Sequence, residues 1–204
     1  LGLQSASSGY IKFDGKEVSK YDNSFKRNIQ VVFQDPYGSF NPRQKIGRLI
    51  TEPFFTLGRE APPETEQRII AQKMLKEVGL SSESIEKYIH EFSGGQRQRI
   101  AIARALVIKP KLIIFDEAVS ALDVSIRSQI LKLISDLTER YGLSYLFISH
   151  DLTVIENITE NCLVMKNGKI VERGQTKHIL RDPKNEYTLS LINAAPKFPN
   201  FLHA

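Results

Sequence analysis

The sequence has almost no cysteine and no long hydrophobic run. Its 204 residues include one cysteine, Cys162, so neither an internal disulfide nor a multi-cysteine metal site is expected. No run of about 18 or more consecutive apolar residues occurs, so no transmembrane helix is expected. What is present is an ordinary balance of 41% hydrophobic and 25% charged residues, which predicts a globular domain with a substantial core.

The charge is weakly basic and dispersed. The net charge is +5, from 28 basic and 23 acidic residues. A nucleic-acid-binding domain usually gathers its lysines and arginines into one patch or stripe, whereas here they are scattered along the sequence. A dispersed, solvated surface is therefore the simpler interpretation, and no nucleic acid is expected as a partner.

The pattern of apolar residues predicts an α/β core that is interrupted by helices. Short β-branched or apolar runs are expected to form buried strands over residues 29–33, 112–115 and 145–148. An amphipathic helix over residues 125–140 separates the last two runs. This strand–helix–strand unit favours parallel strands with a right-handed crossover.

Two hairpins and a helical segment complete the pattern. Alternating residues predict hairpins over 10–18 and 161–174, which turn at Asp14-Gly15 and Asn167-Gly168. Residues 41–110 are expected to be mainly helical. Within them, a helix over 64–78 is predicted to end at Gly79 and to bury five apolar side chains on one face: Ile69, Ile70, Met74, Leu75 and Val78. A helical tail is expected to end at Pro196 and Pro199.

The octet F-S-G-G-Q-R-Q-R, residues 92–99, predicts the start of a helix that could bind an anion. Ser93 is a suitable helix cap, and Gly94 and Gly95 would let a ligand approach the backbone closely. Free N–H groups and the helix dipole favour an anion there, most naturally a phosphate. Taken alone, Ser93-Gly94-Gly95 is equally consistent with an ordinary glycine-rich cap.

Polar residues follow each predicted strand at the edge where ligands bind in α/β folds. Asp116 could hold Mg²⁺ and Glu117 could polarise an attacking water, although an isolated pair of carboxylates could also cap the next helix. His150 follows the neighbouring strand on the same sheet edge as Glu117, near enough to contact a γ-phosphate, although a lone histidine after a strand is more often an ordinary surface residue. Gln34 ends a further strand and could reach Mg²⁺ or water.

Taken in order, these motifs resemble those of the ATP-binding subunit of an ABC transporter. Gln34 corresponds to the Q-loop, and Ser93 to Gln96 correspond to the signature motif. Asp116 corresponds to the end of the Walker B motif, and Glu117 to the catalytic carboxylate. Ser120 to Asp123 correspond to the D-loop, and His150 to the switch histidine. The segments F-Q-D-P-Y-G-S-F-N-P-R at 33–43 and G-L-S-Y-L-F-I-S-H-D-L at 142–152 resemble those of dipeptide, oligopeptide and nickel importers.

The resemblance implies an α/β P-loop NTPase-like ABC ATPase core with an inserted helical subdomain. It divides the chain into a partial ATPase core (1–40 and 110–174), a helical signature subdomain (41–109) and a C-terminal extension (175–204). It implies ATP and Mg²⁺ as cofactors, with Glu117 and His150 as catalytic residues. The implied nucleotide-binding residues are Gln34, Ser93, Gly94, Gly95, Gln96 and Asp123, and the implied Mg²⁺ ligands are Gln34 and Asp116.

The implied partners are a second ABC ATPase subunit, identical or different, and transmembrane permease subunits. An extracytoplasmic binding protein would be an indirect partner, and the implied location is the cytoplasmic face of the membrane. Residues 41–57 could face a permease or form subdomain core, and their apolar side chains are Ile46, Leu49, Ile50, Phe54 and Phe55.

The sequence departs from the family pattern at two points, of which the first changes the expected activity. No G-x-x-x-x-G-K-[ST] loop occurs in the sequence, and Leu1-Gly2-Leu3 resembles the end of the helix that follows such a loop. We therefore expect a truncated chain with an unpaired central strand, unable to hydrolyse ATP alone but able to complete an ATP site on a partner. Ala118 stands where the family usually has proline.

Two alternatives stay open. The chain could be a catalytically silent regulatory partner in an asymmetric dimer. It could also be a soluble ABC ATPase that acts on DNA, although the segment between Gln34 and Ser93 is too short for the coiled coil that such proteins usually insert.

Overall fold

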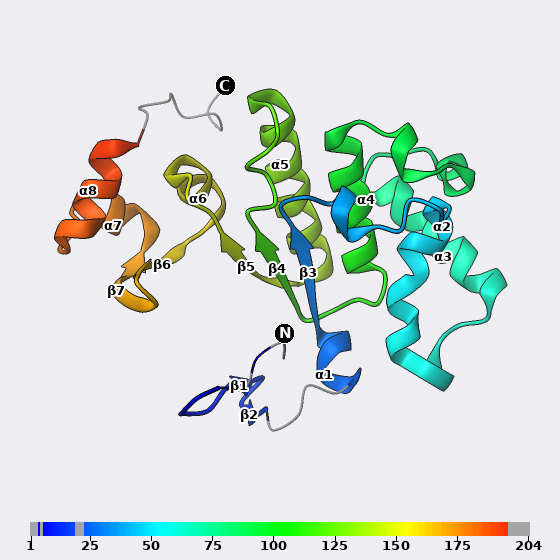
Figure 1. Ribbon diagram of the computed structural model, residues 1–204, viewed down its shortest axis with the longest axis horizontal. Helices are drawn as coiled ribbons and strands as arrows, with labels where there is room; N and C mark the ends of the chain where they lie inside the picture. The colour runs from blue at the N-terminus through cyan, green and yellow to red at the C-terminus, as the bar shows by residue number, and fades with distance from the viewer. Residues whose placement is uncertain (1–3, 5, 19–22, 196–204) are drawn as a thin grey trace.

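A three-stranded parallel sheet lies at the centre of the protein (Figure 1). The computed structural model describes residue 4 and residues 6–18 and 23–195. The strands are β3 (Ile29–Phe33), β4 (Leu112–Asp116) and β5 (Ser144–Ile148), in the order β3-β4-β5. Phe33 pairs with Asp116, and Asp116 with Ile148, so all three strands end at one edge. The predicted strands and their parallel orientation are confirmed.

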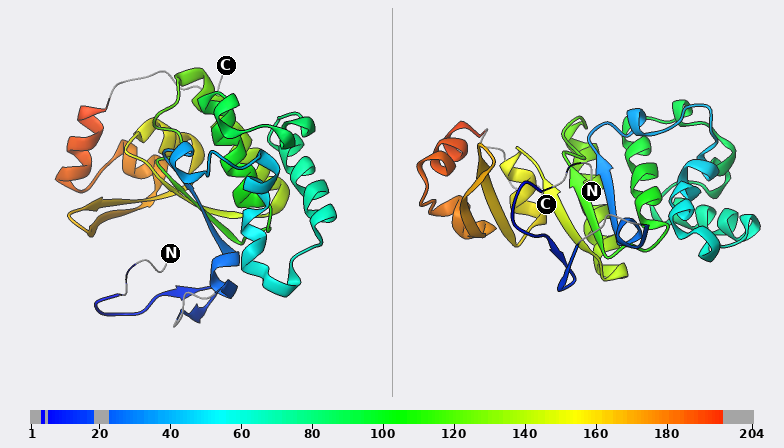
Figure 2. Two further views of the ribbon diagram at one scale, coloured as in Figure 1. Left: turned by 45° about the vertical axis from the view of Figure 1, so that its right-hand side comes forward. Right: turned by 60° about the horizontal axis from the view of Figure 1, so that its bottom comes forward.

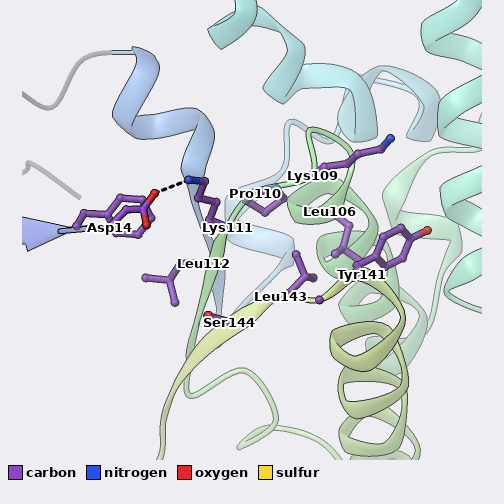
Figure 3. A pocket seen from close by; sticks show the side chains of 11 residues that line it. Asp14, Leu106, Lys109, Pro110, Lys111, Leu112, Tyr141, Leu143 and Ser144 are labelled. Carbon is purple, nitrogen blue, oxygen red and sulfur yellow. Dashed lines mark hydrogen bonds and ion pairs between the residues drawn. The ribbon is translucent and has the colours of Figure 1, made fainter. Parts of the chain in front are cut away.

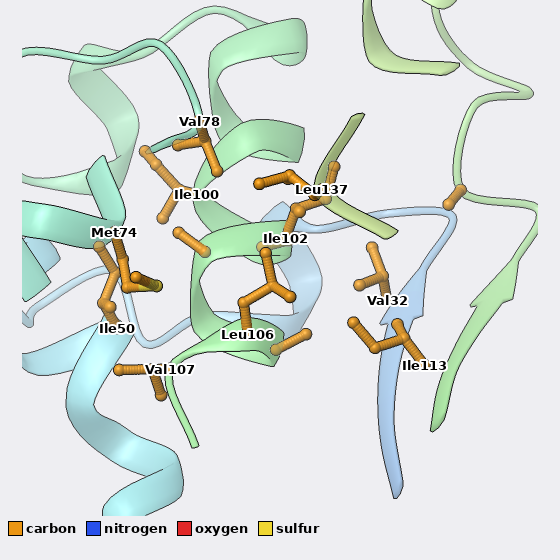
Figure 4. Packing of buried hydrophobic residues seen from close by; sticks show 14 of the residues in the cluster. Val32, Ile50, Met74, Val78, Ile100, Ile102, Leu106, Val107, Ile113 and Leu137 are labelled. Atoms are coloured by element: carbon orange, nitrogen blue, oxygen red, sulfur yellow. The ribbon is translucent and has the colours of Figure 1, made fainter. Parts of the chain in front are cut away.

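Two long helices supply the core against the sheet. They are α4 (Gly94–Leu106) and α5 (Val124–Tyr141), and α5 ends at Gly142 in the left-handed conformation that glycine adopts readily. Figure 4 shows Val32 and Ile113 pointing from the sheet toward Ile102 and Leu106 of α4. This packing fixes α4, and with it the Ser93 turn, relative to the strands that carry the carboxylates.

A group of helices lies beyond α4, and it comprises α2 (Ile46–Thr51), the 3₁₀ segment η2 (Glu52–Glu60) and α3 (Glu64–Glu77). Ile46, Leu49, Ile50 and Phe54 are buried, which confirms the core interpretation for these four residues. Phe55 differs from them, since its side chain is 86% exposed.

One residue that was predicted to be buried on α3, Ile69, is exposed, so this prediction is wrong. Ile69 is 65% exposed, whereas Ala71, Met74 and Leu75 are buried. Ile69 precedes Ala71 by two residues, which puts it on roughly the opposite side of an α-helix. The buried stripe of α3 therefore starts at Ala71, with Ile70 only partly buried beside it.

Two hairpins lie outside the sheet, β1–β2 (Lys12–Phe13 and Lys16–Glu17) and β6–β7 (Asn161–Lys166 and Lys169–Gln175) (Figure 2). Hairpin β6–β7 lies beyond β5, away from α2 and α3, whereas β1–β2 lies at the end of the sheet where the strands begin. Their turns have positive φ at both central residues: 53° and 75° at Asp14-Gly15, and 49° and 75° at Asn167-Gly168. This is the conformation for which Asp-Gly and Asn-Gly are preferred, so both predicted hairpins are confirmed.

The remaining helices are short, and they are α1 (Asn23–Asn28), α6 (Leu152–Ile158), α7 (Thr176–Arg181) and α8 (Glu186–Ala194). Pro196, Pro199 and Leu1 to Leu3 lie outside the described residues. Within the described part of the chain, no helix combines the length and hydropathy needed to cross a membrane.

Candidate functional site

A cavity of about 670 Å³ opens at the carboxyl edge of the sheet, and it is lined by three of the four residues predicted to act there, His150 being the exception. Gln34, Asp116 and Glu117 all line it. The strand register explains the grouping, because Phe33 and Asp116 are paired and the residues that follow them emerge side by side. The cavity is completed by Phe33, Asp35, Gly38 and Ser39.

Glu117 has an unusual backbone conformation at this edge. Its φ is +50°, in the left-handed region that few residues other than glycine occupy. Its N–H donates to the carbonyl of Ile148 at 3.0 Å, and its own carbonyl accepts from the N–H and the hydroxyl of Ser120 at 3.0 and 2.9 Å. These hydrogen bonds hold the residue between the end of β5 and the turn that leads into α5.

His150 lies against Glu117, as its position after β5 predicted. Its Nδ1 is 3.2 Å from Oε1 of Glu117. The His150 side chain is 71% exposed and that of Glu117 is 34% exposed, so both face solvent at the mouth of the site. A Nδ1–H donor would hydrogen-bond the carboxylate and leave Nε2 free for a ligand.

The loop that carries His150 is tied to α5 by Arg127. The Arg127 guanidinium lies 2.5 Å from Oδ2 of Asp151, and it also donates to the carbonyl of Leu122 at 3.4 Å. Asp151 in turn caps α6, because its Oδ1 accepts from the N–H groups of Thr153 and Val154 at 3.0 and 3.3 Å. Arg127 therefore connects the turn before α5 with the histidine loop, a contact that no local sequence pattern predicts.

Ser93 caps α4 as predicted. Its hydroxyl accepts from the N–H of Gln96 at 3.4 Å, while Oε1 of Gln96 accepts from the N–H of Ser93 at 3.0 Å, which forms a capping box. Gly94 is exposed, whereas a Cβ on Gly95 would come within 2.5 Å of Cγ2 of Ile126. Gly95 thus allows the close approach of α4 and α5, and Gly94 leaves the end of the helix open.

The predicted nucleotide-binding residues form two separate groups. Gln34 lies in the cavity with both carboxylates, while Ser93, Gly94, Gly95, Gln96 and Asp123 are outside its lining. Asp123 precedes α5 and makes no side-chain capping hydrogen bond. A Cβ on Gly94 would lie 3.9 Å from Leu122, so the Ser93 turn adjoins the turn that contains Asp123.

Four cavity residues were not predicted as site residues from the sequence: Phe33, Asp35, Gly38 and Ser39. Oδ1 of Asp35 accepts from the N–H of Tyr37 at 3.0 Å, which starts the short 3₁₀ turn η1 (Tyr37–Ser39). An Asp-Pro pair directly after a strand is a turn signal that could have indicated this wall of the cavity.

A second cavity, of about 710 Å³, lies at the opposite edge of the sheet (Figure 3). Lys109, Lys111, Leu112 and Tyr141 are among its lining residues, and Lys111 forms an ion pair with Asp14. None of the predicted site residues lines this cavity.

Comparison with known proteins identifies the family. Residues 1–120 match the family model described as ABC transporter. The chain belongs to the ABC transporter family.

Its ABC-type fold is also that of cbiO1 from Clostridium perfringens, described as part of the ABC transporter complex cbiONQ. That structure matches with a TM-score of 0.77 and 30% identity over 89% of this chain and 71% of cbiO1. The ATP-binding cassette MJ0796, bound to ADP and Pi, matches with a TM-score of 0.72 and 27% identity over 85% of this chain and 76% of that one.

Two curated relatives are ATP-binding proteins, one named for dipeptide transport and the other for glutathione import. The dipeptide transport ATP-binding protein DppF of Escherichia coli K12 is 44% identical over 199 residues, which cover 96% of this chain and 59% of DppF. The glutathione import ATP-binding protein GsiA of Escherichia coli K12 is 46% identical over 200 residues, or 96% of this chain and 32% of GsiA. The chain thus spans about three-fifths of the length of DppF and a third of GsiA. These matches confirm the resemblance to the dipeptide, oligopeptide and nickel importer subfamily.

Proposed function

We propose that this chain is the ATP-binding, energy-coupling subunit of an ABC importer for peptides, with nickel as the alternative cargo. One observation carries the proposal: a single cavity unites Gln34, Asp116 and Glu117 at the carboxyl edge of the sheet. The identity to dipeptide and glutathione import proteins supports the cargo class. By the same analogy, the partners are a second ABC ATPase subunit and permease subunits at the cytoplasmic face of the membrane.

The donors in the cavity suit Mg²⁺, which prefers oxygen ligands and is usually bound by one or two carboxylates together with substrate phosphates. Asp116 and the amide oxygen of Gln34 would hold the ion, which would neutralise phosphate charge when bound. Glu117 would accept the proton of the water that attacks the γ-phosphate. His150 would orient the Glu117 carboxylate through its 3.2 Å contact and offer its other ring nitrogen to the phosphate.

The Ser93–Gly95 turn would act on a nucleotide held by a partner. It lies outside the carboxylate cavity and presents the exposed start of α4, where a phosphate is favoured by free N–H groups. This arrangement supports a shared ATP site, with one part supplied by each of two subunits.

We further propose that the 204 residues alone do not hydrolyse ATP. They contain no G-x-x-x-x-G-K-[ST] loop, which supplies the N–H nest and the lysine that hold phosphates in such enzymes. Phosphoryl transfer depends almost wholly on this positioning.

The first test is ATP hydrolysis by the purified chain beside its Glu117→Gln variant. Both are expected to stay at the background rate, because neither holds a phosphate in front of residue 117. Activity of the chain that Glu117→Gln abolishes would contradict the proposed dependence on a partner and would establish the role of Glu117.

The second test adds an ABC ATPase subunit that carries the phosphate-binding loop. Hydrolysis by the mixture is expected to exceed that of the added subunit alone, and Gly94→Asp is expected to remove the increase by placing a carboxylate against the phosphate. Gly94→Ala is the matched control, since its Cβ would meet only Leu122, at an ordinary 3.9 Å. An equal loss with Gly94→Ala, or no increase on mixing, would contradict the shared site.

A further inference from the structure

Arg104 is a nearly buried cation that binds the wall of the carboxylate cavity. Its side chain is 15% exposed, and it donates from Nη1 to the carbonyl of Ser39 at 2.9 Å and from Nη2 to the Ser39 hydroxyl at 3.0 Å. The guanidinium lies 4.4 Å from the centre of the Phe40 ring. Its one carboxylate partner, Glu52, is 3.6 Å away and itself 59% exposed. Most of the contacts of Arg104 are therefore with residues 39–40.

A second arginine of α4 reaches the same segment. The Arg97 guanidinium lies 4.8 Å from the centre of the Tyr37 ring, and its Nε donates to the carbonyl of Ile89 at 3.2 Å. Arg97 and Arg104 are seven residues apart, which is about two helical turns, so they project from one face of α4. Together they contact three of the four residues 37–40, which we call the wall segment.

The wall segment belongs to the candidate site. Gly38 and Ser39 line the cavity together with Gln34 and both carboxylates. The Ser39 hydroxyl, which accepts from Arg104, donates to the carbonyl of Pro36 at 2.8 Å and so connects the arginine to the turn that follows Gln34. The helix that carries Arg104 begins at the Ser93 turn. Arg104 therefore joins the two groups of predicted nucleotide-binding residues.

We propose that Arg104 is a positioning residue that locks the wall segment to α4, so that the Gln34 side of the cavity and the Ser93–Gly95 turn move as one unit. The identity of the ligand as ATP rests on the proposed function, but the lock itself does not. As a consequence, binding of a ligand in the cavity of one subunit would change the position of the Ser93–Gly95 turn, which the same subunit presents to its partner.

The chemistry of the guanidinium explains why arginine is needed here. Its planar fork bonds the carbonyl and the hydroxyl of Ser39 at once while its face rests on Phe40, a geometry that an ammonium does not reproduce. Burial lowers the pKa of Arg104 from its ordinary value, partly offset by Glu52, yet an arginine stays charged at neutral pH. A buried charge is costly to leave unpaired, so the wall segment is held firmly.

Hydrogen exchange of the 204-residue chain tests the lock without any ligand. Arg104→Met is expected to speed exchange of the Ser39 and Phe40 amides by about tenfold or more, since hydrogen bonds to a charged donor are lost. Arg104→Lys is expected to restore little of the protection, because one ammonium cannot bond both oxygens and stack on the ring. Unchanged exchange in Arg104→Met, or full restoration by lysine, would overturn the proposal.

Arg99→Met is the matched control on the same helix. Arg99 also donates to a backbone carbonyl, that of Val78 at 2.8 Å, but this contact lies outside the wall segment. It is expected to speed exchange near Val78 and to leave Ser39 and Phe40 unaffected. If both variants speed exchange in the wall segment equally, the effect is general destabilisation and the proposal fails.

Ser39→Ala probes the same contact from the other side and keeps Arg104 in place if Arg104→Met does not fold. It is expected to speed exchange at Phe40, and to do so more than the same change does in an Arg104→Lys background, because only the loss of the Ser39 hydroxyl bond to the Pro36 carbonyl is common to both backgrounds. Equal effects in the two backgrounds would overturn the proposal.

Hydrolysis by the mixture described above gives the functional readout. Arg104→Met is expected to lower the maximal rate at least severalfold with little change in the ATP concentration at half-maximal rate, because it disturbs positioning rather than nucleotide binding. An unchanged maximal rate would overturn the link to the Ser93 turn. If the unsubstituted mixture is inactive, the proposed function fails, while hydrogen exchange still decides whether the lock exists.

Discussion

The two faces of the central sheet differ sharply in their packing. One face carries Val32, Ile113, Phe115 and Phe147, which are 1%, 3%, 2% and 8% exposed. The other carries Phe33, Leu146 and Ile148, which are 42%, 47% and 44% exposed. Parallel sheets are normally covered on both faces, so the open face is unusual for this architecture.

The packed face stabilises the described part of the chain, whereas the candidate Mg²⁺ ligand Asp116 lies on the open face. The packed face forms one core with α4 and α5, and its aromatic rings stack, with the centres of Phe115 and Phe147 5.5 Å apart. Asp116 belongs to the row of the open face, between Phe33 and Ile148. The stability of this part of the protein thus depends on one side of the sheet, while the metal-binding candidate lies on the other.

The largest expected difference is in stability. Ile113→Ala should lower the free energy of unfolding by about 2–5 kcal/mol, because it leaves a cavity in a closed core. Ile148→Ala is the matched change on the open face and should cost about 1 kcal/mol, since the side chain is only half removed from water. Urea denaturation followed by circular dichroism measures both. Equal costs would show that the two faces do not differ energetically.

A smaller effect is expected on self-association. Leu146→Glu should reduce concentration-dependent association of the chain, because it places a charge in the exposed apolar row of β5. Leu189→Glu on α8 is the control, since Leu189 has the same 47% exposure outside the sheet. Sedimentation velocity over a range of concentrations compares them. An equal reduction by both variants would remove the open face as the cause.

The smallest effect is expected from pH. Burial, with a further contribution from Glu160, raises the pKa of Tyr145 above its ordinary value of 10.0 in the folded state. The folded protein then keeps this proton while the unfolded chain loses it, so stability should fall as the pH rises above about 10. In Tyr145→Phe the free energy of unfolding should fall less steeply above about pH 10. The variant also loses the hydrogen bond from the Tyr145 hydroxyl to the carbonyl of Ile158.

Two measurements decide the alkaline prediction. Phenolate absorbance should show two tyrosines, Tyr141 and Tyr145, titrating later in the folded protein than in urea, and only one of them should remain in Tyr145→Phe. The raised pKa of Tyr141 leaves a residual alkaline slope in the variant. A variant whose stability falls as steeply as that of the unsubstituted chain would contradict the assignment.

Local patterns were enough to predict the sheet and both hairpins. Strand ends, turn residues and parallel direction follow from short-range signals, and together they also placed Gln34, Asp116, Glu117 and His150 at one edge. The Ser93 cap was predictable for the same reason, since a capping box spans only four residues.

What could not be predicted depends on contacts between distant segments. Phe55 and Ile69 are apolar at spacings compatible with burial, yet the subdomain leaves them in water. Arg104 and Ser39 are 65 residues apart, so no local rule joins them. The separation of the Ser93 turn from the cavity is likewise a result of how α4 packs, which sequence spacing does not encode.

The left-handed backbone of Glu117 has an evolutionary consequence. A conformation of this kind costs a residue with a side chain about 1–2 kcal/mol, and glycine would relieve it. Selection for folding alone would thus tend to replace Glu117, and with it the only carboxylate that touches His150 among the described ion pairs. A glutamate at such a position is what a requirement for its charge, rather than for its contribution to stability, would produce.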